Sequence, residues 1–269
     1  MPKPIFVVDA FTEVAFAGNP AAVVVLDRTD AVADSWMTAV AAEMNLSETA
    51  FIAPRAEGGW HLRWFTPTIE VELCGHATLA AAHVLFGRGD ADSGTTIEFH
   101  TRWSGRLDVT KLADDRLEMN FPARVPRPAE LEPVVLEALG GRPTDTLSHS
   151  NGYDLVVYAT APEVRELEPD HHRLRSCGTH GVIVTALGDH PHIDFVSRYF
   201  APGAGIEEDP VTGSAHCVLA PFWAERLHKD SLVGLQVSPR TGVVECQLRE
   251  DRVLLRGHAT TVLTGHLHA

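Results

Sequence analysis

The chain has 269 residues, enough for one large domain or two domains of ordinary size, with 45% apolar and 22% charged residues as in globular proteins. No apolar stretch approaches the roughly 20 residues of a membrane span, so no membrane partner is expected. A formal net charge of -14 and the lack of a dense Lys/Arg run argue against a nucleic-acid partner. The scattered cysteines, with no Cys-x-x-Cys pair, favour a reducing, cytoplasmic setting.

The first half of the chain predicts short strands around one buried helix. Strands are expected at residues 5–9, 21–26, 48–52, 62–65, 95–99, 106–110 and 116–120, with a Gly18-Asn19-Pro20 turn between the first two. A helix over 34–44 has Asp34 as a candidate cap and Asn45 as a stop. Residues 76–86 are apolar on nearly all faces, which is typical of a helix buried inside a domain, and Gly87 should end it.

The second half follows the same plan, with a helix that starts near Ser214 and that Pro221 must kink or end. Strand-rich halves, each with a helix, indicate an α+β fold rather than alternating β-α-β units.

The chain repeats itself once. Arg63-Trp64-Phe65-Thr66-Pro67 matches Arg198-Tyr199-Phe200-Ala201-Pro202 at an offset of 135 residues (198 − 63 = 135). Cys74-Gly75-His76-Ala77 matches Thr212-Gly213-Ser214-Ala215 at an offset of 138 (213 − 75 = 138). A period this long predicts two similar domains. The proline-rich segment 120–128 marks the boundary, so we expect domains at 1–120 and 121–269, with a C-terminal tail that can pack on the first half.

Glu48 lies in Asn45-Leu46-Ser47-Glu48-Thr49, at a helix-to-strand junction before the apolar Ala50-Phe51-Ile52. Apolar surroundings suit a carboxyl group to general-base chemistry. The alternative is a solvated surface glutamate.

Gly75 and Gly213 each directly precede a predicted helix. Bare backbone N–H groups at a helix start favour an anion such as a carboxylate, and glycine lets the ligand approach closely. Two such starts could hold a small acidic substrate between the halves. The alternative is that both are ordinary turn glycines.

Cys74 is predicted at a helix N-terminus, which lowers the pKa of a thiol, and it lies two residues from His76. A nucleophile or one-base catalyst is one interpretation and a small buried residue is the other. A two-thiol racemase would need a second cysteine in the matching stretch Asp209-Pro210-Val211, which has none.

Fifteen histidines raise the question of a metal, but His171-His172 and the pairs at 190/192 and 266/268 lack matched ligand spacing, so no metal is predicted. The chain has neither a dinucleotide loop nor a P-loop, so no nucleotide cofactor is predicted.

Four motifs together resemble the PhzF-type phenazine-biosynthesis isomerase family, within the diaminopimelate epimerase-like fold. These motifs are Val8-Asp9-Ala10-Phe11-Thr12 with Gly18-Asn19-Pro20, Asn45-Leu46-Ser47-Glu48-Thr49, Cys74-Gly75-His76-Ala77-Thr78, and Glu208-Asp209-Pro210-Val211-Thr212-Gly213-Ser214-Ala215. The resemblance implies two pseudosymmetric domains, each a curled, mostly antiparallel sheet around a central buried helix. It also implies an active site between the domains, a homodimer, and no cofactor or metal.

By this resemblance Glu48 moves a proton from one substrate carbon to another. Gly75 and His76, with Asp209, Gly213 and Ser214, bind the polar groups of the substrate and assist proton relay. Cys74 stands where the phenazine enzyme has alanine and where related epimerases have a catalytic cysteine.

The sequence therefore predicts a cofactor-independent isomerase that acts on a small carboxylate, with Glu48, Asp209 and His76 as catalytic residues. Gly75, Gly213, Ser214 and Cys74 are expected to bind the substrate. The alternatives are an epimerase or racemase dependent on Cys74 and a non-catalytic binding protein of the same fold.

Overall fold

The computed structural model describes residues 2–28, 32–178 and 181–268. The chain divides into two compact units, one of Met1–Asn120 with Arg256–Ala269 and one of Phe121–Leu255. Strands β8 (Leu117–Pro122) and β16 (Arg252–Gly257) carry the chain from one unit into the other.

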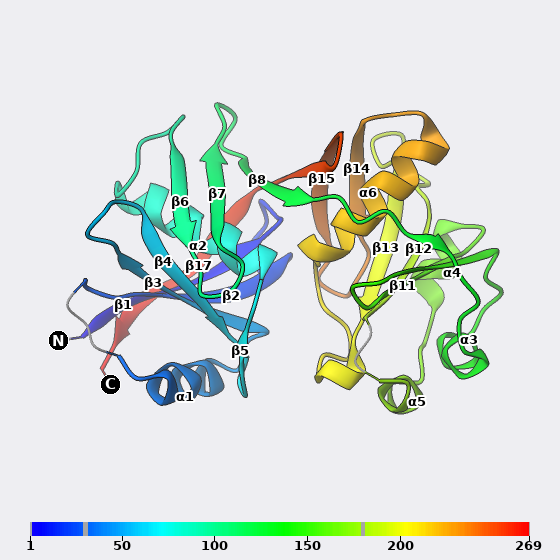
Figure 1. Ribbon diagram of the computed structural model, residues 1–269, viewed down its shortest axis with the longest axis horizontal. Helices are drawn as coiled ribbons and strands as arrows, with labels where there is room; N and C mark the ends of the chain where they lie inside the picture. The colour runs from blue at the N-terminus through cyan, green and yellow to red at the C-terminus, as the bar shows by residue number, and fades with distance from the viewer. Residues whose placement is uncertain (1, 29–31, 179–180, 269) are drawn as a thin grey trace. The chain divides into compact units, whose positions relative to one another are not determined.

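The first unit is a mixed, mostly antiparallel sheet with two helices. Its other elements are β1 (Lys3–Ala10), β2 (Asn19–Val25), α1 (Asp34–Met44), β3 (Glu48–Pro54), β4 (Trp60–Phe65), β5 (Glu70–Val71), α2 (Gly75–Arg88), β6 (Thr96–His100), β7 (Arg106–Lys111) and β17 (Ala259–Leu267). Only the β2–β3 and β4–β6 pairs are parallel among the pairings described within this unit. The sheet curls around α2, and α1 lies on its outer face (Figure 1).

Helix α2 forms the centre of this unit because nearly every one of its faces is apolar. Its buried residues include Leu79, the alanines at 80–82 and Leu85, and it packs against β1, β2 and β3. The predicted stop at Gly87 is wrong by two residues. The helix runs to Arg88, and Gly89, at φ 77°, takes the left-handed position that bonds back to the last turn.

Helix α1 has the predicted bounds, but its first residue is Asp34 and its N-cap is Ala33. The expected side-chain cap by Asp34 is therefore wrong, because its carboxylate bonds Arg63 and Arg102 instead. The helix ends as predicted at Asn45, in the left-handed conformation at φ 49°.

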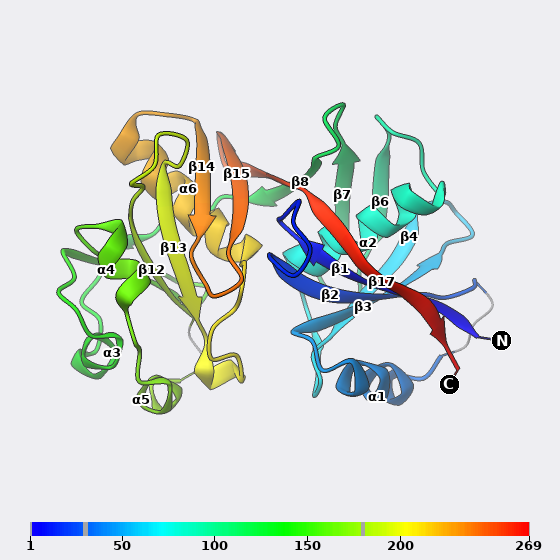
Figure 2. The ribbon, with the colours of Figure 1, turned by 180° about the vertical axis from the view of Figure 1, so that it is seen from behind.

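The last strand belongs to the first unit: the predicted boundary at residue 269 for the second domain is too long, while the expectation that the C-terminal tail can pack on the first half agrees with the structure. Strand β17 pairs antiparallel with β1 from Lys3↔Leu267 to Ala10↔Ala259, and Figure 2 shows the two strands side by side. This pairing accounts for the difference. Strand β2 pairs with one edge of β1, and β17 returns to pair with the other edge, which would otherwise stay open.

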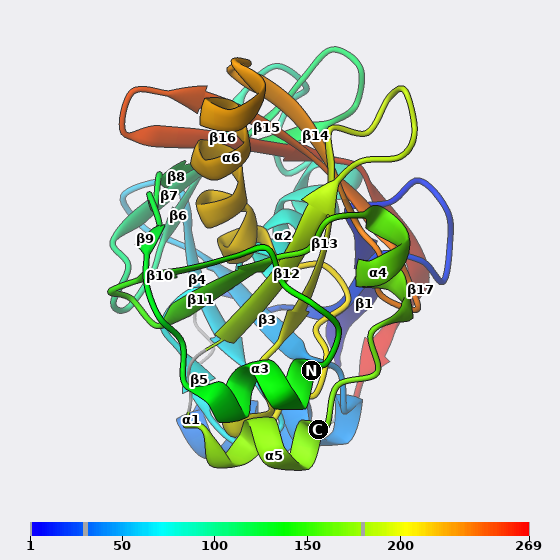
Figure 3. The same cartoon turned by 90° about the vertical axis from the view of Figure 1, so that its right-hand side faces the viewer.

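The second unit repeats the plan of the first with a different outer layer. Its elements are β9 (Arg127–Pro128), α3 (Pro133–Leu139), β10 (Asp145–His149), β11 (Tyr153–Val157), α4 (Ala161–Glu166), α5 (His171–Ser176), β12 (Gly181–Leu187), β13 (Phe195–Phe200), η1 (Pro202–Ala204), α6 (Gly213–Leu227), β14 (Ser231–Gln236) and β15 (Gly242–Arg249). Helix α6 packs against β14 and β15, while α3 and α5 lie beside each other at one edge of the unit (Figure 3). Pro221 lies inside α6, so the helix does not end there as one prediction had it.

The repeated segments occupy matching places in the two units. Strands β2 and β3 pair parallel and β3 and β4 antiparallel, and β11, β12 and β13 repeat this order. Arg63 on β4 forms a two-bond ion pair with Glu70, at 2.6 and 2.5 Å, and Arg198 on β13 does the same with Glu208, at 2.7 and 2.9 Å. The two glutamates are separated by the same 138 residues as the two glycines (208 − 70 = 138).

The outer faces of the two sheets are covered differently. In the first unit α1 is the helix, among those described, that contributes to the cluster around Phe51 and Phe65. In the second unit α3, α4 and α5 together bury a larger apolar cluster that includes Val196 and Phe200. Among the helices of the described ranges, none has the length and apolarity needed to cross a membrane.

Candidate active site

Four polar side chains meet inside the first unit, beside the start of α2. The Nε2 atom of His76 lies 3.1 Å from Oε2 of Glu48, and Nδ1 of the same ring lies 3.1 Å from the amide nitrogen of Asn19. The Sγ atom of Cys74 lies 3.5 Å from His76 Nδ1. All four residues are buried, with Glu48 only 8% exposed, so the alternative of a solvated surface glutamate is excluded.

Three chain segments bring these groups together. Glu48 is the first residue of β3, directly after the turn that Asn45 begins. Parallel pairing of β3 with β2 places Glu48 opposite Ala21, and Asn19 starts the same β2 strand. His76 follows Gly75 in the first turn of α2, so backbone pairing and the helix start together fix the cluster.

Gly18 is required just before this cluster. Its φ of +64° is in the left-handed region, and a Cβ atom there would lie 2.2 Å from the carbonyl oxygen of Ala10. The predicted turn at 18–20 is therefore shorter than expected, because Asn19 and Pro20 already belong to β2.

The carboxylate of Glu48 controls the charge of His76. Burial alone lowers the pKa of this imidazole, but the neighbouring sulfur and the negative charge of Glu48 outweigh burial and raise the pKa well above its usual value. Because its pKa is raised well above the usual value, His76 is an imidazolium at neutral pH.

The expected acidic thiol at Cys74 is wrong. Burial, together with the charge of Glu48, raises the pKa of Cys74 to about 11, and the contacts with His76 offset this only in part. Helix N-termini lower a thiol pKa when the thiol is accessible to water, whereas Cys74 is 6% exposed and faces a carboxylate.

Asn19 can form a hydrogen bond with His76 in either charge state of the ring, because an amide has a donor nitrogen and an acceptor oxygen. The nitrogen donates to Nδ1 of a neutral ring, and after a turn of the amide the oxygen accepts from a protonated ring. Asn19 can therefore bond the ring whichever charge state it has.

Glu48, Cys74 and His76 also form a set of possible metal donors. A carboxylate oxygen, a sulfur and a ring nitrogen lie within 4.8 Å of one another, which suits a zinc-like ion in donor type. Among the residues that the structure describes, no other such group of three was found. The absence of a metal in the working protein stays a prediction.

The other predicted residues form a second buried cluster inside the second unit. The Thr212 hydroxyl donates to Oδ2 of Asp209 at 2.5 Å, and the Gln236 amide donates to the Asp209 carbonyl at 2.7 Å. The Gln236 carbonyl accepts from the Thr212 backbone N–H at 2.8 Å. This network fixes Asp209 directly before α6, whose first residues are Gly213 and the half-buried Ser214.

Helices α2 and α6 begin at Gly75 and Gly213, as the repeat predicts. The N-cap residues are Cys74 and Thr212, and neither caps its helix through a side-chain hydrogen bond. Both first turns therefore keep the polarity that attracts an anion.

Sequence reasoning assigned no role to Asn19 or Gln236. Asn19 had a usable signal, since it stands in the Gly18-Asn19-Pro20 motif, but that motif was interpreted as a turn and as part of the family resemblance, with no role for the Asn19 side chain. Gln236 had no such signal in the sequence. It lies 24 residues beyond Thr212, at the end of β14, and the two residues meet only in the folded unit.

Fold and clusters together define a two-unit, epimerase-type α+β protein with a buried carboxylate–imidazole pair. A hydroxyproline epimerase from Agrobacterium vitis shares the fold, with a TM-score of 0.63 over 99% of this chain and 92% of that chain at 10% identity. A crystal structure of a phenazine biosynthesis protein of the PhzF family from Enterococcus faecalis superposes with a TM-score of 0.92 at 40% identity, covering 100% of both chains.

The chain belongs to the family described as phenazine biosynthesis-like protein, whose sequence profile matches residues 8–265. A relative from Halalkalibacterium halodurans, named an uncharacterised isomerase, is 44% identical over 268 residues and covers 99% of each chain. These matches make the chain an isomerase of this family with the diaminopimelate epimerase-like fold, and they set aside a non-catalytic binding protein.

Proposed function

We propose that the protein moves a proton between two carbons of a small carboxylate substrate, with Glu48 as general acid and base. The observation that carries this proposal is the buried contact of 3.1 Å between Glu48 Oε2 and His76 Nε2. A neighbouring imidazolium stabilises the ionised form of a carboxylate, which is the form that accepts a proton, and burial keeps competing water away.

In the proposed reaction the Glu48 carboxylate removes a proton from a carbon made acidic by an adjacent unsaturated or carboxyl group. The same side chain then returns that proton to a different carbon. His76 keeps its own proton, and its positive charge stabilises the ionised form of Glu48 before the proton is taken up and after it is returned. Asn19 contacts the other ring nitrogen and holds the imidazole in place.

The backbone N–H groups at the start of α2, beside Gly75, would bind the carboxylate of the substrate or the charge that develops on it. We propose that Asp209, Gly213 and Ser214 supply the substrate-binding groups of the second unit. The hydrogen bonds from Thr212 and Gln236 support a fixed role for Asp209, since they hold its side chain and backbone before α6.

Cys74 is the rival centre, as in an epimerase that uses a thiol. Its position 3.5 Å from His76 Nδ1 keeps it near the chemistry, but a thiol with a pKa raised to about 11 is a poor base at neutral pH. We therefore assign Cys74 to the wall of the binding site.

The test is solvent deuterium incorporation into a panel of small unsaturated, hydroxy and amino carboxylates in D₂O, followed by mass spectrometry. The wild type should label at least one compound, Cys74→Ala should keep this activity, and Glu48→Gln should lose about 10²–10⁴-fold in rate. Glu72→Gln is the matched control, because Glu72 is exposed and lies in the segment that leads to α2. Full labelling by Glu48→Gln, or loss of labelling only in Cys74→Ala, would show that Glu48 is not the base.

We further propose that the enzyme needs no bound metal or cofactor, works as a homodimer and resides in the cytoplasm. The free cysteines Cys74, Cys177, Cys217 and Cys246 support a reducing compartment. Turnover should survive dialysis against EDTA, and sedimentation should give about twice the chain mass of 29.2 kDa.

A further inference from the structure

An open hollow of about 550 Å³ lies on the outer face of the first unit, and none of Asn19, Glu48, Cys74 and His76 lines it. Cationic or protonatable side chains dominate its lining, namely Arg55, His61, Arg63, His100 and Arg102, with Asp34 as the acidic lining residue. This cluster of basic side chains differs from the rest of the chain, which carries a formal net charge of -14.

The hollow exists because α1 covers only part of the sheet. Successive residues of β4 alternate, so that Leu62 and Trp64 are buried on the inner face while His61 and Arg63 point outward. The position that matches His61 in the second unit is Val196 (196 − 61 = 135), which is fully buried in the apolar cluster of α3, α4 and α5. The first unit has no such helical layer there, and its surface is polar instead.

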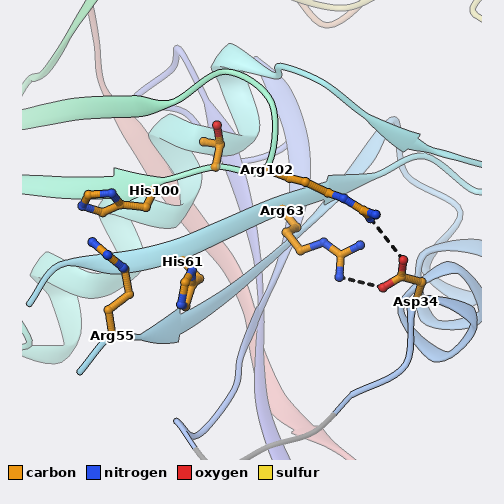
Figure 4. Close-up of a pocket in the computed structure, with 7 residues that line it drawn as sticks. Asp34, Arg55, His61, Arg63, His100 and Arg102 are labelled. Carbon is orange, nitrogen blue, oxygen red and sulfur yellow. Dashed lines mark hydrogen bonds and ion pairs between the residues drawn. The ribbon is translucent and has the colours of Figure 1, made fainter. Parts of the chain in front are cut away.

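The two ends of the hollow differ in charge balance (Figure 4). At one end, Arg63 and Arg102 are neutralised by Asp34 and Glu70, with contacts of 2.5–3.2 Å. That end is a closed ion-pair network and offers little positive charge to a ligand.

At the other end, Arg55, His61 and His100 lie close together with weaker partners. His61 and His100 are direct neighbours in the parallel pairing of β4 with β6. The Nε atom of Arg55 is buried and forms no hydrogen bond within the described parts of the chain, and its Nη1 donates a long hydrogen bond of 3.4 Å to the Gly58 carbonyl. Its ion-pair contact with Glu57 is 3.6 Å long, and the Glu57 side chain is 73% exposed.

We propose that Arg55, His61 and His100 form a second ligand site, which binds the phosphate group of a small metabolite. A guanidinium group presents paired N–H donors that match two phosphate oxygens, and two imidazoles supply donors for the rest. The hollow has the size of ordinary metabolite sites, so a phosphate ester with a small organic part fits better than a free ion alone.

Binding at this site should depend on pH. The charged groups around His61 are Arg55, His100 and Glu57, and those around His100 include Glu98 at 3.9 Å. Partial burial, Arg55 and His100 lower the pKa of His61, so the ring is largely neutral without a ligand at neutral pH. A bound dianion favours the protonated rings, and affinity should therefore rise as pH falls from 8 to 6.

The experiment is NMR titration and calorimetry of the full chain with inorganic phosphate, glycerol phosphate and malonate. Sulfate is added for the pH series because it stays dianionic from pH 8 to 6. Arg55→Gln and the double change His61→Gln with His100→Gln are the test variants. Arg88→Gln is the matched control, since Arg88 is a partly exposed arginine paired with Asp90 outside the hollow.

We expect glycerol phosphate to bind more tightly than malonate, and Arg55→Gln to weaken it at least about tenfold while Arg88→Gln leaves it unchanged. Sulfate should bind more tightly at pH 6 than at pH 8, and this pH dependence should vanish in the double histidine variant. Tighter binding of malonate, signals that shift elsewhere, or affinity unaffected by Arg55→Gln in a protein with an intact spectrum would each overturn the proposal. Turnover is not used as a readout, so the result is independent of the role of Glu48.

Discussion

Replacing Glu48 by Gln should change the charge of His76, and this prediction needs no substrate. Two opposite unit charges 3.1 Å apart interact by about 5 kcal/mol at an effective dielectric constant of about 20, an upper figure for this contact. Measured effects of one nearby opposite charge are smaller, about 1–3 pH units. We therefore expect the midpoint of the His76 titration in Glu48→Gln to move to lower pH by about that amount.

The other buried histidine, His216, shows in which direction the pKa of His76 should move. His216 is fully buried, with no carboxylate acting on it among the described residues, and burial lowers its pKa to about 4. Without the charge of Glu48, His76 loses one of the two groups that raise its pKa, and the same desolvation then counts for more. At pH 7 the ring should be charged in the wild type and neutral in Glu48→Gln.

The assay is a pH titration of the histidine ring signals in nitrogen-15 NMR spectra, with His76→Asn used to identify the signal among 15 histidines. Glu72→Gln, which removes an exposed carboxylate, should leave the midpoint in place. An equal midpoint in wild type and Glu48→Gln, or a wild-type midpoint at or below the ordinary value of about 6.5, would refute the reasoning about this pair.

Three further predictions concern other buried groups. Because the pKa of Cys74 is raised to about 11, only about 1 thiol in 10,000 is ionised at pH 7, so mass spectrometry should find iodoacetamide on the half-buried Cys177 well before Cys74. His216 is neutral in the fold, whereas the unfolded chain takes up a proton below about pH 6.5, so stability should fall by about 3 kcal/mol between pH 6.5 and 4. His216→Asn should lose this part of the pH dependence in urea unfolding at the two pH values, and an unchanged slope would contradict it. Arg198→Met should cost about 3–5 kcal/mol in the same assay, because it leaves the nearly buried Glu208 without its cation, while changing Glu208→Leu as well should restore much of the loss.

The sequence predicted the local elements and the candidate residues Glu48 and His76 better than the pairings between distant segments. Strand and helix bounds follow from short patterns, and the repeat located the two helix starts at Gly75 and Gly213. Glu48 and His76 were both selected, but their contact depends on the packing of α2 against β2 and β3. Such packing joins segments that are far apart in the chain, so one sequence carries no local signal for it.

The same limit explains what sequence reasoning missed. Nothing near Gln236 indicates that it will bond Thr212. The outer layer of α3, α4 and α5 was also missed, because these helices are short and their apolar residues become recognisable as one face only against the sheet. Burial reversed the expected acidity of Cys74, since the local helix effect is weaker than desolvation at a closed site.

The place of β17 has a consequence for biosynthesis. The second unit is an insertion between two pieces of the first, so the ribosome completes every strand of the second unit before it makes the partner of β1. The nascent second unit can therefore fold before β17 is made, while the edge of β1 that β17 will pair with is still open. Strand β17, made after the whole second unit, is then the segment that completes the pairing of β1 in the first unit.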